Sequence, residues 1–167
     1  MNFLEFTLEH NYALFESIDT SSLEYVGEFK ANPNKTKMFV YRNENIWFIF
    51  EAEGVISKPS NTYEFSFGSS SKEISKEEMP DIFDFISFDK LATSNPIKTF
   101  ALCAEAIKRF LSDNYAIVEL QGVHDDKESS NYTNPSIRSR SIFRSLKNLK
   151  DFPYQITLNR NLVTISK

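Results

Sequence analysis

The sequence has few of the residues that cross-link or loosen a chain. Its 167 residues include one cysteine and four glycines. A single cysteine excludes a disulfide within the chain, and Cys103 is predicted to be a buried small hydrophobe, because no neighbour in sequence would lower its pKa. A chain of this length typically buries about 70% of its unfolded surface. We therefore predict one domain, residues 1–167, that needs no disulfide or metal to fold.

Long apolar runs and catalytic signatures are also absent from the sequence. No stretch approaches the ~18 apolar residues of a membrane span, and the amino terminus lacks a basic segment followed by an apolar one. We expect a soluble, cytoplasmic protein with no membrane partner. There is no glycine-rich phosphate loop and no Gly-x-Ser-x-Gly turn. The sequence thus shows no recognisable catalytic motif and implies no cofactor, which leaves the question of enzymatic activity open.

Aromatic and β-branched residues dominate residues 1–68. Segments rich in Phe, Tyr, Val and Ile, each bounded by turn residues, are typical of an antiparallel meander. Four such strands are predicted, over 24–30, 36–41, 45–52 and 62–67. Residues 3–15 predict two more strands and a turn, with a short helix from Tyr12 as the competing interpretation. The aromatic residues are interpreted as core, and an aromatic-lined ligand groove is the alternative.

Residues 69–94 form an acidic connection. Glutamates and aspartates outnumber lysines there, but Ile82, Phe83, Phe85 and Ile86 indicate a stretch that packs against the rest of the protein. We predict a loop followed by a short helix or irregular segment. It is interpreted as an ordinary connection, and a lid over the sheet or a contact surface for a basic partner are the alternatives.

The pattern of residues 95–167 predicts a helix, a strand, a second helix and a hairpin, in that order. Asn95-Pro96 and Asn134-Pro135 are helix-start signals, and an apolar strand runs from Tyr115 to Gly122 between the two helices. A hairpin is predicted from segments 154–158 and 162–165. Strands followed by mixed elements predict an α+β fold: a largely antiparallel sheet with two main helices packed on one face.

The second of these helices carries the main candidate site. Residues 133–150 contain five basic residues and no acidic one, in a chain of formal net charge −4. Basic side chains at a helix start, together with free backbone N–H groups, can hold an anion. We therefore predict an anion-binding site where the preceding strand ends and this helix begins, formed by Gly122, Asp125, Arg138, Arg140 and Arg144. The alternative is that Arg138 pairs with Asp125, Asp126 or Glu119 and ties the loop down.

Two other functions fit this stretch less well. The basic stripe could contact nucleic acid phosphates, although a solvated amphipathic helix explains it more simply. Metal-dependent phosphodiester cleavage, as in a nuclease or toxin, would require Glu119, Asp125 and Asp126 to converge on a metal ion. The Glu119-Leu120-Gln121 strand is similar to the acidic strand of restriction-type nucleases, but Gln121 stands where those have lysine. No metal site is therefore assigned.

The segment from Thr99 to Arg144 resembles small bacterial domains of unknown function. In those domains a strand is followed by a helix with the pattern Arg-x-Arg-x-Leu-Tyr/Phe-Arg, to which Arg138, Arg140, Ile142, Phe143 and Arg144 correspond. The resemblance covers about a third of the chain and implies the fold and a specific placement of the arginines, but no activity. We expect a binding or interaction module whose partner is an anionic small molecule or an acidic protein surface. A homodimer paired through the aromatic sheet is a further alternative.

Overall fold

The computed structural model describes residues 18–87, 96–121, 137–149 and 151–167. The strands predicted over residues 3–15 lie outside these ranges. For Pro96, Gln121 and residues 137–141 the backbone alone is described.

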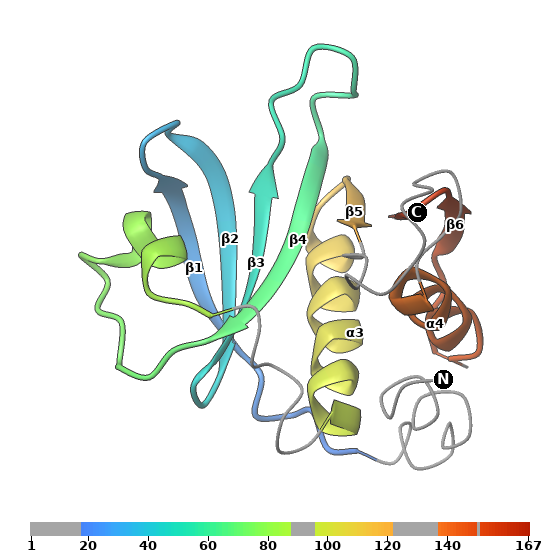
Figure 1. Ribbon diagram of the computed structural model, residues 1–167, viewed down its shortest axis with the longest axis horizontal. Helices are drawn as coiled ribbons and strands as arrows, with labels where there is room; N and C mark the ends of the chain where they lie inside the picture. Colours follow the sequence, from blue (N-terminus) through green and yellow to red (C-terminus); the bar gives the residue numbers. More distant parts are fainter. Residues whose placement is uncertain (1–17, 88–95, 122–136, 150) are drawn as a thin grey trace.

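Seven strands form one sheet in the spatial order β1-β2-β3-β4-β5-β7-β6 (Figure 1). Neighbouring strands are antiparallel except β4 and β5, which run parallel. The four predicted meander strands, the apolar strand and the C-terminal hairpin are all present. Their bounds are β1 (Glu24–Ala31), β2 (Thr36–Asn43), β3 (Ile46–Ala52), β4 (Thr62–Ser69), β5 (Ile117–Gln121), β6 (Gln155–Asn159) and β7 (Leu162–Ser166).

The two long helices cover one face of this sheet, which we call the inner face. They are α3 (Pro96–Asp113) and α4 (Ile137–Lys147), and both contribute side chains to the main core (Figure 1). A short 3-10 helix, η1 (Met79–Asp84), lies in the acidic connection and packs on the opposite, outer face. The structure therefore confirms the predicted α+β fold with a mostly antiparallel sheet and both helices on one face.

Successive side chains of β2 and β3 alternate between a hydrophobic core on the inner face and a second one on the outer face. On the inner face, Phe50 of β3 stacks on Phe110 of α3 with ring centroids 4.1 Å apart. On the outer face, Trp47 and Ile49 of β3 pack with Ile82 of η1. Successive residues of a strand point to opposite faces, so one aromatic-rich strand holds a helix on one side and the η1 segment on the other. Most of the described aromatic residues of these strands form core, as predicted, although Tyr25 is exposed, and η1 is the predicted docked segment.

The buried surface of α3 is wider than one apolar stripe. Leu102 and Ala106 are fully buried in addition to the side of the helix that carries Phe100, Ala101, Cys103, Ala104, Ile107, Phe110 and Leu111. Arg109, on the polar side, donates hydrogen bonds to Glu105 Oε1 at 2.8 Å and to the carbonyl oxygen of Leu23 at 2.7 Å. Arg109 thus ties the polar side of α3 to the chain that precedes β1. Cys103 is buried as predicted, and burial raises the pKa of its thiol.

Candidate functional site

The structure describes only part of the predicted anion site. Gly122 and Asp125 lie outside the described residues, and Arg138 and Arg140 fall in the first turn of α4, where only the backbone is described. Arg144 lies one turn before the end of the helix and is exposed. The convergence of these five residues on one ligand therefore stays a prediction.

Helix α4 divides into an apolar and a basic side, as the sequence indicates. Leu146 is 1% exposed, and Ile142 and Phe143 pack partly buried against the main core. Arg144 and Lys147 are exposed, and the Lys147 ammonium lies 5.0 Å from the centre of the Phe143 ring. The helix contains no acidic residue. Its solvent side is therefore basic in a chain of formal net charge −4.

Glu119 lies on the opposite face of the sheet from α4. Its neighbours in β5, Val118 and Leu120, belong to the inner core, so the Glu119 side chain projects from the outer face. There the ammonium of Lys58 lies 2.5 Å from Glu119 Oε2 and 2.7 Å from Glu53 Oε2. Glu119 thus already has a cationic partner, which comes from the β3–β4 loop.

The pKa values of Glu119, Lys58 and Glu64 are all raised at this cluster. Burial raises the pKa of the Glu119 carboxyl; the Lys58 ammonium acts against that shift and the Glu53 carboxylate adds to it. Hydrogen bonds to Glu119 and Glu53 raise the pKa of Lys58. Burial, followed by the charges of Glu53 and Glu51, raises the pKa of the neighbouring Glu64. Glu119, Lys58 and Glu64 therefore each hold a proton more tightly than the same side chain does in water.

A metal site is not formed by these carboxylates. Within the described ranges, no group of three or more His, Cys, Asp or Glu residues has the arrangement needed to hold a metal ion. Asp125 and Asp126 lie outside those ranges, so their convergence with Glu119 stays a prediction.

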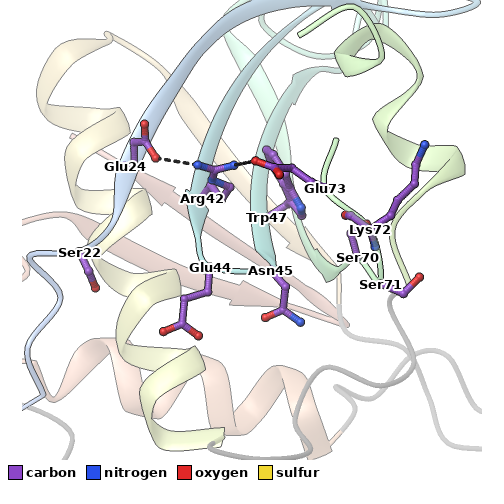
Figure 2. Close-up of a pocket in the computed structure, with 10 residues that line it drawn as sticks. All are labelled: Ser22, Glu24, Arg42, Glu44, Asn45, Trp47, Ser70, Ser71, Lys72 and Glu73. Carbon is purple, nitrogen blue, oxygen red and sulfur yellow. Dashed lines mark hydrogen bonds and ion pairs between the residues drawn. The ribbon is translucent and has the colours of Figure 1, made fainter. Parts of the chain in front are cut away.

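The described residues also form a concave site that the sequence did not indicate. It is a hollow of about 400 Å³ on the outer face, at the end of the sheet where β1 begins and β2 turns into β3 (Figure 2). The backbone N–H of Ser70 donates to the carbonyl oxygen of Asn45 at 2.9 Å, which fixes the chain after β4 beside that turn. The lining residues are Ser22, Glu24, Arg42, Glu44, Asn45, Trp47, Ser70, Ser71, Lys72 and Glu73.

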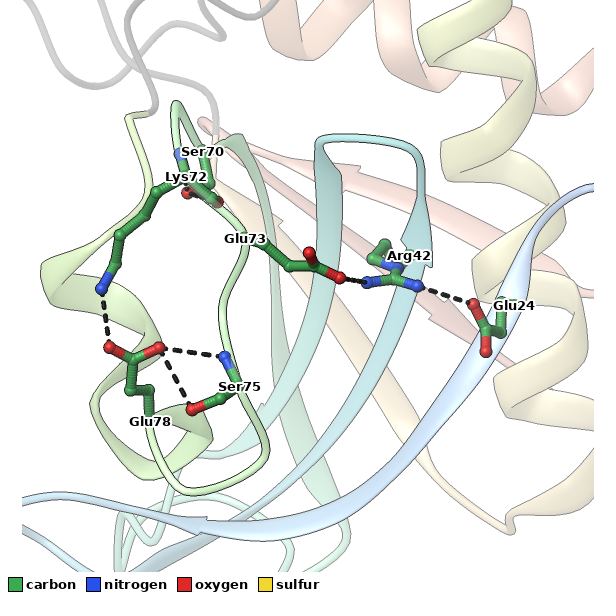
Figure 3. A network of polar contacts seen from close by, with 7 residues as sticks. All are labelled: Glu24, Arg42, Ser70, Lys72, Glu73, Ser75 and Glu78. Atoms are coloured by element: carbon green, nitrogen blue, oxygen red, sulfur yellow. Dashed lines mark hydrogen bonds and ion pairs between the residues drawn. The ribbon is translucent and has the colours of Figure 1, made fainter.

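Arg42 is the central charged residue of the hollow. Its guanidinium lies 3.2 Å from the carboxylate of Glu24 and 3.9 Å from that of Glu73 (Figure 3). It also lies over the indole of Trp47, 5.4 Å from the ring. Arg42 pairs with both Glu24 and Trp47 in the strand register, so the pleat of the sheet brings these three side chains together.

Lys72 lines the hollow, but its ammonium is directed away from Arg42 (Figure 3). It donates to Glu78 Oε1 at 2.6 Å and lies 4.1 Å from the centre of the Phe85 ring. The other oxygen of Glu78 accepts from the backbone N–H of Ser75 at 2.9 Å. These bonds, Lys72 first, lower the pKa of Glu78. Lys72 therefore anchors the segment before η1 and does not balance the carboxylates of the hollow.

Trp47 is the most buried of the residues that line this hollow. It is 2% exposed, and its indole Nε1 is buried without an acceptor among the described residues. An unpaired buried donor typically costs about 1–3 kcal/mol. No spacing motif links Arg42, Trp47 and Glu73 in the sequence. The only available signal was an arginine and a tryptophan flanking a predicted turn, which is too general to identify a site.

Comparisons with known proteins identify no relative of this chain. No family model, no curated protein and no solved structure matches the chain. The resemblance to bacterial domains of unknown function therefore stays a prediction. Among the described helices, none has the length and apolar character that crossing a membrane requires.

Proposed function

We propose that this protein acts by binding, and that the basic side of α4 receives an anionic ligand or an acidic protein surface. The observation that carries the proposal is the division of α4 into a docked apolar side and an exposed basic side without any acidic residue. Basic side chains on such a surface bind carboxylates and phosphates through charge-assisted hydrogen bonds. The helix start adds free backbone N–H groups and partial positive charge close to Arg138 and Arg140.

The proposal does not include catalysis. Glu119, the one described residue of the phosphodiester-cleaving alternative, has its carboxylate engaged by Lys58 on the other side of the sheet. This arrangement favours a structural role for Glu119. On the basic helix, by contrast, the described basic residues Arg144 and Lys147 are exposed on the inner side of the sheet.

The test is a double substitution at the start of the helix, Arg138→Ala with Arg140→Ala. Two probes are titrated by calorimetry: inorganic pyrophosphate and a polyglutamate peptide. Loss of two charge-assisted contacts is expected to weaken binding about tenfold or more. The matched control is Lys30→Ala with Lys76→Ala, which removes the same charge from exposed positions on other elements. Unchanged affinity in a folded Arg138/Arg140 variant, or an equal loss in the control, would contradict the proposal.

A further inference from the structure

The hollow around Arg42 has more negative than positive charge in its lining. Glu24, Glu44 and Glu73 contribute three carboxylates, which are 61%, 78% and 88% exposed. The Lys72 ammonium is bonded to Glu78. Arg42 is therefore the cation between the carboxylates of Glu24 and Glu73, whereas Glu44 lies 4.0 Å from the ammonium of Lys98. Such a lining favours a positively charged ligand.

Trp47 adds a second feature that points to a ligand. Its ring already accommodates the planar guanidinium of Arg42 at 5.4 Å, an arrangement in which the aromatic face attracts a cation. Its Nε1 is a hydrogen-bond donor without an acceptor among the described residues, in a side chain that is 98% buried and lines the hollow. A ligand that satisfies this donor must supply an acceptor atom.

The side chains that cover Trp47 can move at low cost. The partners of Arg42 are exposed carboxylates, at 3.2 Å from Glu24 and 3.9 Å from Glu73. Exposed ion pairs of this kind contribute little to stability. A ligand cation can therefore take over one carboxylate while Arg42 keeps the other, which opens a path toward the indole.

We propose that this hollow binds a guanidinium or ammonium group that is carried next to a hydrogen-bond acceptor, as in an arginine residue of a peptide. One of the two carboxylates, Glu24 or Glu73, receives the cation while Arg42 keeps the other, and Trp47 Nε1 donates to the acceptor, for which a peptide carbonyl oxygen is suitable. The site is separate from α4 and takes a ligand of opposite charge. A free small molecule and a peptide segment could both supply this chemistry.

Trp47 is the only tryptophan of the chain, so its fluorescence reports on the hollow directly. The purified full chain is titrated with acetyl-arginine amide, with its neutral isostere acetyl-citrulline amide, and with agmatine, which has the guanidinium but no carbonyl group. Acetyl-arginine amide is expected to give a saturable change in Trp47 emission and to bind at least about fivefold more tightly than either analogue. A ligand that is a peptide segment would be marked by still tighter binding of an Arg-containing tripeptide, and a free small molecule by no further gain.

Charge variants locate the binding. Glu24→Gln with Glu73→Gln removes both carboxylates that the cation could use and is expected to weaken acetyl-arginine amide binding about two- to fivefold, in line with the loss of one exposed ion pair. Glu77→Gln with Asp84→Asn is the matched control, because both residues are exposed and lie outside the hollow. Three results would overturn the proposal: no saturable change with acetyl-arginine amide, equal binding of the citrulline analogue or agmatine, or equal weakening in the control.

Discussion

Lys58 stabilises two carboxylates with one ammonium group on the outer face. Replacing Lys58 with methionine keeps most of the unbranched side chain but removes the ammonium group, which leaves the buried Glu119 facing Glu53 without a cation. We expect the variant to lose about 1–3 kcal/mol of unfolding free energy at neutral pH, the usual cost of leaving a buried polar group unpaired. Urea unfolding measures the loss. Lys76→Met is the control, because Lys76 is exposed; a similar loss there would argue against the ion pairs as the cause.

The buried carboxyl of Glu119 should also make the unfolding free energy depend on pH. Burial raises the pKa of its carboxyl above the ordinary value of 4.5. A carboxyl with a higher pKa in the folded chain stabilises the fold while it is protonated, and this contribution is lost as the pH rises through the folded pKa. The unfolding free energy of the natural chain minus that of Glu119→Gln should therefore fall as the pH rises from 4.5 into the neutral range. Urea titrations across this range measure it, and a difference that grows with pH would show a lowered pKa.

At the scale of single residues, the sequence predicted burial better than polar contacts. The buried positions of Cys103 and Phe110 follow from the periodicity of one helix, which is local information. The Lys58–Glu119 contact joins residues 61 positions apart, and the Arg42–Glu73 pair depends on where the chain after β4 returns. Such contacts are set by the sheet, so no local pattern could predict them.

Among the elements, η1 offers a sharp test because it packs against Trp47. Ile82 is fully buried in the outer cluster, and its replacement by alanine should cost about 2–5 kcal/mol. Loosening of η1 should also shift the native emission of Trp47 to longer wavelength, since water reaches the indole. Leu146→Ala on α4 is the control: it removes an equally buried side chain from the inner core. It should destabilise the protein without shifting the native emission.

The sequence predicted which segments form helices and which form strands. It did not predict which other parts of the chain pack against them. Turn residues such as Asn32-Pro33-Asn34 separate the strands, and hydrophobic periods of two and 3.6 residues distinguish strands from helices. The polar side of α3 meets the chain before β1, whose Leu23 and Thr20 carbonyl oxygens accept from Arg109. A helical wheel describes one helix in isolation and contains no information about such a neighbour.

For the whole molecule, we expect a single cooperative unfolding transition. Strands β2 and β3 supply side chains alternately to the inner core and to the outer cluster, so neither side can lose its packing without disturbing the other. Trp47 fluorescence, which reports the outer cluster, should therefore follow the same urea curve as helical circular dichroism, which reports α3 and α4. An earlier fluorescence transition would show that the η1 side opens by itself.

The fold class was predictable for the whole molecule, while the strand order was not. Segregated strands followed by mixed elements predicted α+β correctly. The sequence does not show that β5 joins β4 in parallel, or that β7 lies between β5 and β6. These pairings depend on how α3 carries the chain across the sheet, which is decided by packing over the whole protein.

The parallel seam between β4 and β5 has a consequence for synthesis of the protein. It pairs Thr62 with Ile117, whereas every pairing among β1 to β4 joins strands adjacent in sequence. On the ribosome, the four-stranded meander therefore emerges with all its own partners before β5 exists. Until α3 emerges, the aromatic inner face of that nascent sheet is uncovered, and until β5 follows α3, β4 is an open edge. This is the interval in which the growing chain is most exposed to association with other chains.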